Sequence, residues 1–261
     1  MMARMPAAVA ITRAVSAGLA ACELTYQARV PIDVGVARAQ HQAYEEALAS
    51  AGYRVERLDA DATMPDSVFV EDMAIVFEEL AILTRPGAES RRREMPAIAA
   101  ALAPYRSLRE IQPPAVVDGG DVLVAGRRVY VGRSTRTNDA ALTQMRHILE
   151  PFGYTVTAVE VRGCLHLKSA VTALADEVLL VNPAWIDRAV FDGFRLVDVA
   201  PEEPSAANAL RLADRVLAAR AFPRTADRIA ALGLRVDQVD ASELAKAEGA
   251  VTCCSLIVAG G

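Results

Sequence analysis

Cysteine is scarce in this chain of 261 residues, where it occurs only at Cys22, Cys164, Cys253 and Cys254. Four cysteines are too few for a disulfide scaffold, and because no two form a CxxC pair the sequence carries no zinc or redox motif of that kind. We therefore expect the chain to function in the reducing cytoplasm, where free thiols are the rule.

Long apolar runs and an excess of positive charge are lacking as well. No stretch of about 18 apolar residues occurs, so we expect no membrane span. The formal net charge is −5, which argues against nucleic-acid binding because such proteins need a basic surface. Leu19–Cys22 has the form of a lipoprotein cleavage site, but Arg13 interrupts the apolar run before it. We expect a first strand followed by a loop there.

The composition is that of a globular protein, with 53% hydrophobic and 23% charged residues. The length suits one large domain or two small ones. Because no linker, low-complexity tract or charge block divides the chain, we predict a single domain over residues 1–261. These features leave the oligomeric state open and are compatible with a homodimer.

One pattern recurs five times with a period of roughly fifty residues: a short apolar strand, a tight break, a helix and a second strand. Each helix can cover only one face of the strands that it joins, so the units must pack around a shared centre. The predicted segments are Val9–Val15, Val34–Ala51 and Arg54–Leu58; Leu80–Thr84 and Glu89–Ala103; Arg128–Gly132, Ser134–Pro151 and Tyr154–Val161; Glu177–Val181, Pro183–Phe191 and Phe194–Val199; and Arg215–Ala219, Phe222–Leu232 and Arg235–Val239.

Two adjacent thiols, Cys253 and Cys254, open an apolar segment near the end of the chain. We interpret that segment as a strand, in which neighbouring side chains point to opposite faces. Either thiol could then face a functional site while the other is buried. Taken alone, a free cysteine is more often a small buried hydrophobe than a nucleophile.

The chain has three histidines, and His166 is the one with a candidate role. His41 and His147 fall within predicted helices, at surface or partly packed positions. His166 alternates with Leu165 and Leu167, which indicates a strand that presents the imidazole to a cleft. A thiol, a histidine and a carboxylate such as Asp118 together form the set used in nucleophilic catalysis.

Charged islands of both signs accompany these residues. Asp66, Glu71 and Asp72 lie just before a buried strand, where carboxylates could hold a cationic ligand. Arg91, with its neighbours, and Arg136 could each bind a carboxylate through two parallel hydrogen bonds. Together the islands indicate a zwitterionic ligand, cationic at one end and anionic at the other.

Six motifs in order along the chain resemble the dimethylarginine dimethylaminohydrolase family of the guanidino-modifying, or pentein, superfamily. The resemblance implies an α/β propeller of five ββαβ-like units around a central active site, which agrees with the repeat. The motifs are Phe69-Val70-Glu71-Asp72, Thr84-Arg85-Pro86-Gly87-Ala88 with Ser90-Arg91-Arg92, Asp118-Gly119-Gly120-Asp121-Val122-Leu123, Ser134-Thr135-Arg136-Thr137-Asn138, Leu165-His166-Leu167-Lys168-Ser169 and Thr252-Cys253-Cys254-Ser255.

The resemblance implies roles for five residues at the reacting end of the substrate. Cys253, the first of the adjacent cysteines, would be the nucleophile, and His166 the general acid and base. Asp118 would orient His166 and contact the guanidinium group. Asp72 would pair with the same group, with Glu71 close by.

At the amino-acid end of the substrate the resemblance implies five more. Arg91 and Arg136 would hold the α-carboxylate, and Asp66 would lie near that end. Leu24, in the loop after the first strand, would offer its backbone carbonyl to the α-amino group. Ala247 would provide a second backbone contact.

The activity implied is hydrolysis of asymmetric dimethylarginine and monomethylarginine to citrulline and dimethylamine or methylamine. It would proceed through an S-alkylthiouronium adduct on Cys253, with a small-molecule substrate as partner and without a metal or organic cofactor.

Two alternatives remain open. The first is an arginine deiminase-like hydrolase acting on unmethylated arginine or a related guanidino or ureido compound, although that family resemblance implies a longer chain. The second is a non-catalytic pentein that binds a ligand or a protein. It is disfavoured because a binder has no reason to keep Cys253, His166 and Asp118 together.

Overall fold

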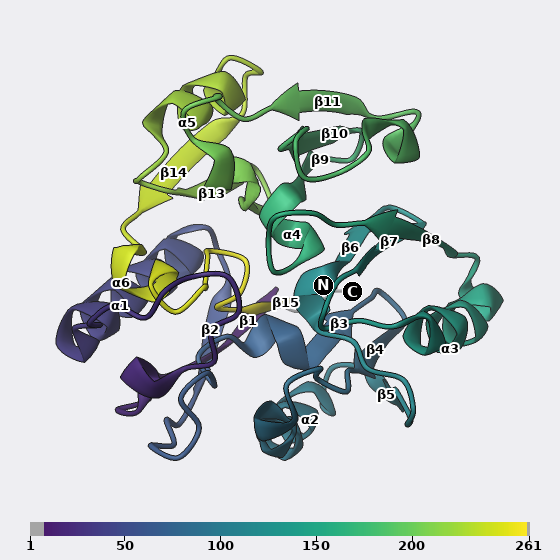
Figure 1. Cartoon of the computed structure of the whole chain (residues 1–261), viewed down its shortest axis with the longest axis horizontal. Helices are drawn as coiled ribbons and strands as arrows, with labels where there is room; N and C mark the ends of the chain where they lie inside the picture. Colours follow the sequence, from purple (N-terminus) through teal and green to yellow (C-terminus); the bar gives the residue numbers. More distant parts are fainter. Residues whose placement is uncertain (1–7, 260–261) are drawn as a thin grey trace, which may run out of the picture.

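The computed structural model describes residues 8–259, whose strands form five three-stranded sheets arranged around a common centre (Figure 1). In each sheet the middle strand pairs antiparallel with one neighbour and parallel with the other. The parallel pair requires a crossover connection, which gives every unit its ββαβ-like order. The predicted α/β ring of five units is confirmed.

Nine of the fifteen strands in the described residues lie in the segments predicted for the repeat, which did not include Ser107–Glu110 or the antiparallel outer strand of each sheet. The sheets contain β3 (Ala74–Val76), β4 (Leu80–Leu83) and β5 (Ser107–Glu110); β6 (Val122–Ala125), β7 (Arg128–Arg133) and β8 (Thr155–Glu160); β9 (Val171–Ala175), β10 (Val178–Val181) and β11 (Arg195–Asp198); β12 (Leu210–Leu212), β13 (Arg215–Ala219) and β14 (Arg235–Val239); and β15 (Leu256–Val258), β1 (Val9–Arg13) and β2 (Arg54–Leu58).

The crossover helices lie on the outside of the ring, whereas the short helix α4 lies near its centre (Figure 1). Within residues 8–259, no helix has the length and apolarity needed to cross a bilayer. The helices are α1 (Val34–Ser50), α2 (Met95–Leu102), α3 (Asp139–Leu149), α4 (Leu167–Ala170), α5 (Pro223–Ala230) and α6 (Ser242–Ala245).

The prediction of a helix over Pro183–Phe191 is wrong, because that crossover contains only a 3-10 helix at Arg188–Phe191. The side chain of Asn182 accepts a hydrogen bond from the N–H of Ala184 at 2.9 Å, and Asp187 accepts one from Ala189 at 3.0 Å. Such local side-chain bonds offer the backbone turns in place of a helix.

The fifth sheet closes the ring by joining the two ends of the described chain. Strand β1 pairs antiparallel with β15, with Val9 opposite Val258 and Ile11 opposite Leu256. As a result, the loop after β1 and the turn before β15 both lie near the centre of the ring. Cys22 lies in that loop and is buried. The prediction of a first strand followed by a loop is therefore confirmed.

His41 on α1 is buried, with 2% of its surface exposed, and not at the surface or partly packed as expected. Its Nδ1 lies 3.6 Å from Oε1 of Glu45, too far for a good hydrogen bond. Its Nε2 has no hydrogen-bond partner among the described residues. Burial, together with the positive charge of Arg57, lowers the pKa of His41 to about 4.

We expect His41 to make the protein sensitive to mild acid. The unfolded chain takes up the proton at a pKa of about 6.5 and the folded chain only at about 4, so stability falls as the pH drops through this window. The shift corresponds to about 3 kcal/mol of unfolding free energy. Urea unfolding at pH 7 and pH 4.5 should show this loss in the native protein and a smaller one in His41→Leu. An equal loss in both proteins would contradict the assignment.

Candidate active site

A cavity of about 20 Å³ lies at the centre of the ring and receives side chains from segments far apart in sequence. It is bordered by seven of the ten residues predicted for the site, namely Asp66, Asp72, Arg91, Arg136, His166, Ala247 and Cys253. Three predicted residues, Leu24, Glu71 and Asp118, do not border it. The structure therefore brings most of the predicted set to one place.

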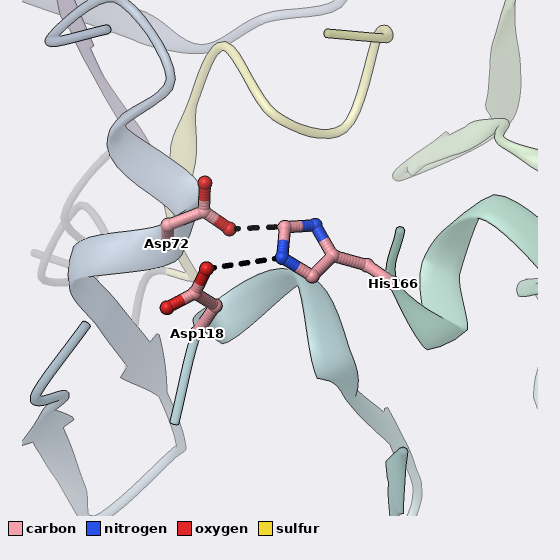
Figure 2. A group of neighbouring side chains, drawn as sticks. All are labelled: Asp72, Asp118 and His166. Atoms are coloured by element: carbon pink, nitrogen blue, oxygen red, sulfur yellow. Dashed lines mark hydrogen bonds and ion pairs between the residues drawn. The ribbon is translucent and has the colours of Figure 1, made fainter. Parts of the chain in front are cut away.

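His166 does not lie in a strand, as we expected, but stands immediately before α4 as its N-terminal capping residue. The residue itself has extended backbone angles, and the helix begins at Leu167. Its imidazole faces two carboxylates that lie on the same side of the ring (Figure 2), with Nε2 3.1 Å from Oδ2 of Asp118 and Nδ1 3.9 Å from Oδ1 of Asp72.

The charge state of His166 is set by these acids. Burial by itself would lower the pKa of the imidazole, but the carboxylates of Asp72, Asp118 and Asp121 outweigh it and raise the pKa to about 9. At neutral pH both ring nitrogens therefore carry a proton, and the imidazole is a cation. This makes His166 a charged donor facing the cavity, able to give a proton to a departing group.

Asp118 lies behind the imidazole and is fully buried. Its Oδ1 accepts a hydrogen bond from the N–H of Gly87 at 2.8 Å while Oδ2 contacts His166. Arg136 approaches the same oxygen at 3.7 Å. These contacts fix the carboxylate, so Asp118 can hold the imidazole in one orientation.

The paired glycines after Asp118 allow this close packing. A Cβ at Gly120 would lie only 2.5 Å from Nδ1 of His166, and one at Gly119 would lie 2.0 Å from the carbonyl oxygen of Glu71. Any larger residue would displace the imidazole or the backbone that carries the acids. The glycines thus serve close approach of the chain, which a residue with a Cβ would prevent.

Asp121, which the sequence analysis gave no role, connects three of the motifs. Its Oδ1 accepts a bond from the N–H of Leu167 at 2.9 Å, which fixes the start of α4. Its Oδ2 accepts bonds from the hydroxyls of Ser134 at 2.5 Å and Thr137 at 2.6 Å. The sequence shows that this motif contains two acids, Asp118 and Asp121, but only the structure shows that they bind different groups.

Asp72 and Arg91 form a buried ion pair at the wall of the cavity, with Oδ2 of Asp72 2.5 Å from Nη1 of Arg91. Burial would raise the pKa of Asp72, but the charges of His166 and Arg91 lower it below its usual range. Asp72 thus remains an anion in the cavity. It is suited to hold a cationic group there.

The guanidinium of Arg91 is already heavily bonded. It donates to Glu94 through Nε at 3.1 Å and through Nη2 at 3.0 Å, and to the carbonyls of Asp66 and Phe69. Only one N–H of Nη1 remains for a ligand among the described residues. Arg136 is more available, because among the described residues its guanidinium donates one hydrogen bond, from Nη2 to the hydroxyl of Thr25 at 3.0 Å.

Glu71 lies behind the cavity and borders a second one, of about 260 Å³. Its Oε1 is 2.5 Å from Nζ of Lys168, and its Oε2 accepts a bond from the hydroxyl of Thr252 at 2.7 Å. Glu71 is therefore close to the site, as expected, but its carboxylate is occupied by protein groups.

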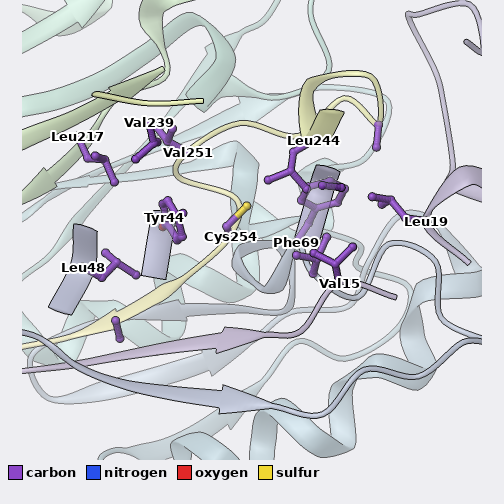
Figure 3. Close-up of a cluster of buried hydrophobic side chains, with 14 of the residues drawn as sticks. Val15, Leu19, Tyr44, Leu48, Phe69, Leu217, Val239, Leu244, Val251 and Cys254 are labelled. Carbon is purple, nitrogen blue, oxygen red and sulfur yellow. The ribbon is translucent and has the colours of Figure 1, made fainter. Parts of the chain in front are cut away.

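The two thiols lie in a turn before β15 and not within a strand, so the expected alternation does not apply to them. Cys253 borders the cavity. Cys254 is 1% exposed and packs in an apolar cluster with Tyr44 and Val251 (Figure 3). Burial, with the charges of Glu71 and Asp72, raises the pKa of the Cys253 thiol above its usual range.

The loop after β1 contributes Glu23 to the border of the cavity. The N–H of Glu23 donates to both carboxylate oxygens of Asp66, each at 3.2 Å. Burial raises the pKa of Asp66 to about 6. Leu24 is half-buried against the hydrophobic core.

Sequence reasoning missed Glu23, Phe69 and Glu248, which also border the cavity. Phe69 belongs to a quoted motif, so its position there was a usable signal. Glu23 and Glu248 stand in no motif.

Three groups in the site, Asp72, Asp118 and His166, have atoms within 4.8 Å of one another that could serve as metal ligands (Figure 2). One of these contacts is the hydrogen bond between the imidazole and Asp118. The expectation of a metal-free site stays a prediction.

Comparison with known families gives a match over most of the chain. A family model described as "N,N dimethylarginine dimethylhydrolase, eukaryotic" matches residues 27–254. The chain is 42% identical over 254 residues to N(G),N(G)-dimethylarginine dimethylaminohydrolase of Streptomyces coelicolor, covering 97% of each chain. It is 38% identical over 226 residues to the Pseudomonas aeruginosa enzyme of the same name, covering 86% of this chain and 89% of the relative.

Solved structures agree. A cysteine-to-serine mutant of the Pseudomonas aeruginosa enzyme complexed with citrulline matches with a TM-score of 0.91 and 35% identity, over 96% of this chain and 99% of that one. The N-terminal domain of ArgZ, a cyanobacterial arginine dihydrolase bound to product, matches with a TM-score of 0.87 and 18% identity, over 97% and 98%. At that identity the second likeness shows the fold alone.

Proposed function

The chain belongs to the dimethylarginine dimethylaminohydrolase family, and we propose that it hydrolyses Nω-methylated arginine to citrulline, releasing dimethylamine or methylamine. The observation that supports this most strongly is that one cavity holds a thiol, a protonated imidazole and buried carboxylates, in Cys253, His166 and Asp72. These are the groups that attack on a guanidinium carbon requires.

The guanidinium group binds beside Asp72 in this proposal. Asp72, held ionised by its neighbours, pairs with the cation, whereas Asp118, which the structure places outside the cavity lining, orients His166. Arg136 binds the α-carboxylate, assisted by the remaining N–H of Arg91. At the same end lie Asp66 and the backbone carbonyls of Leu24 and Ala247.

Binding of the cation activates the nucleophile. Before binding, the thiol of Cys253 is kept protonated by burial and by the negative charges nearby. The positive charge of the guanidinium offsets those charges, which lowers the pKa of the thiol, and its proton passes to solvent.

The reaction then has two halves. Sγ of Cys253 forms a bond to the guanidinium carbon, and His166 gives its proton to the methylated nitrogen as the carbon–nitrogen bond breaks. This leaves an S-alkylthiouronium adduct and free amine. His166, now neutral, takes a proton from water, which adds to the same carbon. The carbon–sulfur bond breaks with its electron pair returning to Sγ, the proton of the added hydroxyl passes to solvent, and citrulline leaves.

We also propose that residues 1–261 act as one catalytic domain and that the protein is cytoplasmic. The shared ring of five units supports the first proposal. The four cysteines, all free, support the second.

The proposed activity is tested by citrulline release from asymmetric dimethylarginine, monomethylarginine and arginine, measured side by side. Release from the methylated substrates with little from arginine supports the proposal. Release from arginine alone would make the chain an arginine deiminase. Binding of methylarginine without citrulline release from any of the three would favour a non-catalytic binder.

A further inference from the structure

We propose that Glu248 is a positioning residue for the substrate, because its carboxylate holds the loop after β1 and thereby sets the direction of the Leu24 carbonyl. The inference rests on the proposed function, in which that carbonyl meets the α-ammonium group of methylarginine. It gives a task to a side chain that borders the cavity and takes no part in the mechanism described above.

The contacts of Glu248 are concentrated on three successive backbone N–H groups. Oε2 accepts a hydrogen bond from Thr25 at 3.0 Å, and Oε1 accepts bonds from Tyr26 and Gln27, each at 2.6 Å. Consecutive N–H groups that converge in this way form a binding site for an anion. Because the acceptor is charged, each bond is stronger than one between neutral groups.

The backbone of Glu248 is itself unusual. Its φ is +58°, in the left-handed region that residues other than glycine seldom adopt. Its two neighbours in sequence, Ala247 and Gly249, both border the cavity. Backbone strain of this kind persists where the surrounding contacts hold it, and it is concentrated at binding sites.

The hydrogen bond from Thr25 determines where the Leu24 carbonyl points. The carbonyl of Leu24 and the N–H of Thr25 belong to one planar trans peptide, so they point in opposite directions. Once Glu248 fixes the N–H, the carbonyl is directed away from Glu248. On the other side of Leu24, the N–H of Glu23 is held by Asp66. Leu24 is thus fixed between two carboxylates.

The same loop reaches the residue proposed to bind the α-carboxylate. The hydroxyl of Thr25 accepts a hydrogen bond from Nη2 of Arg136 at 3.0 Å. That contact is made by the side chain of Thr25, whereas Glu248 binds the backbone N–H of the same residue. We therefore expect Arg136 to keep its place when the carboxylate of Glu248 is removed, and the effect of Glu248 to fall on the Leu24 carbonyl.

Glu243 on α6, five residues before Glu248, provides a matched control. Its carboxylate accepts a hydrogen bond from the N–H of Asp33 at 2.9 Å and pairs with Lys246 at 2.7 Å. It holds a backbone amide as Glu248 does, but at the start of α1 and away from Leu24. Glu243→Gln should change stability without changing substrate recognition.

The test compares asymmetric dimethylarginine with its analogue lacking the α-amino group. Glu248→Ala should lower kcat/KM for dimethylarginine by about 10- to 100-fold, mainly through KM, and for the analogue by less than about threefold. Glu248→Gln should fall between, and Glu243→Gln should leave both values unchanged. Equal losses on the two substrates, or no loss on either, would overturn the proposal.

Hydrogen exchange of the amides of residues 25–27 separates this inference from the proposed function. These amides should exchange faster in Glu248→Ala and Glu248→Gln than in the native protein, whether or not the chain releases citrulline. Unchanged exchange would overturn the role of Glu248 even in an active enzyme. Faster exchange in a chain without activity would remove the proposed function and retain the contact. If the alanine variant fails to fold, Glu248→Gln carries both measurements.

Discussion

Replacing Cys253 by serine should reduce citrulline release from asymmetric dimethylarginine by at least about 10⁴-fold, since loss of a nucleophile from such a catalytic set is among the most damaging changes known. A serine hydroxyl fits the space of the thiol but ionises far less readily. The guanidinium carbon, whose charge is delocalised, needs the stronger nucleophile. Steady-state assays of purified Cys253→Ser, with folding checked by circular dichroism, measure the effect.

Cys254→Ser is the matched control and should keep most of the activity. Cys254 is buried, and its Sγ donates to the carbonyl of Ala250 at 3.6 Å, a bond that a hydroxyl can also make. Its cost should appear in thermal stability. An inactive Cys254→Ser beside a fully active Cys253→Ser would reverse the assignment of the nucleophile.

The second large effect is expected at His166. His166→Ala should lower kcat by about 10²–10⁴-fold, because proton transfer to the leaving amine is lost. Since its pKa is raised to about 9, the native enzyme should lose activity as the pH rises through that value and the imidazolium gives up its proton. This limb of the pH profile should be absent in the variant.

Added imidazole should restore part of the activity of His166→Ala, because it can supply the missing proton donor. The exposed histidine on α3 offers a control, and His147→Ala should behave as the native protein. A pH profile in His166→Ala identical to that of the native enzyme would show that another group transfers the proton.

The repeat could be predicted from sequence because the middle strand of each sheet is a short, largely apolar run. β10 is an example, since Val178–Val181 is apolar throughout. The crossover after it could not be predicted, because its turns depend on the side chains of Asn182 and Asp187 and not on hydrophobic periodicity.

Within the site, residue types could be predicted but not their geometry. Alternation along a strand could not distinguish Cys253 from Cys254, because both lie in a turn where burial makes the distinction. The contacts of Glu248 join residues 221 to 223 positions apart. A local sequence pattern cannot indicate a contact between residues so far apart in the chain.

The pairing of β1 with β15 has a consequence for synthesis of the protein. The first strand is made before the other strands of the ring, but its antiparallel partner, residues 256–258, is made after them. Until then the ring lacks a strand, and Cys253 has no fixed place beside His166. Pairing of β15 with β1 completes the ring and also brings Cys253 to its place beside His166. A nascent or prematurely ended chain is therefore unable to attack the cell's arginine derivatives, and only the finished fold carries reactive chemistry.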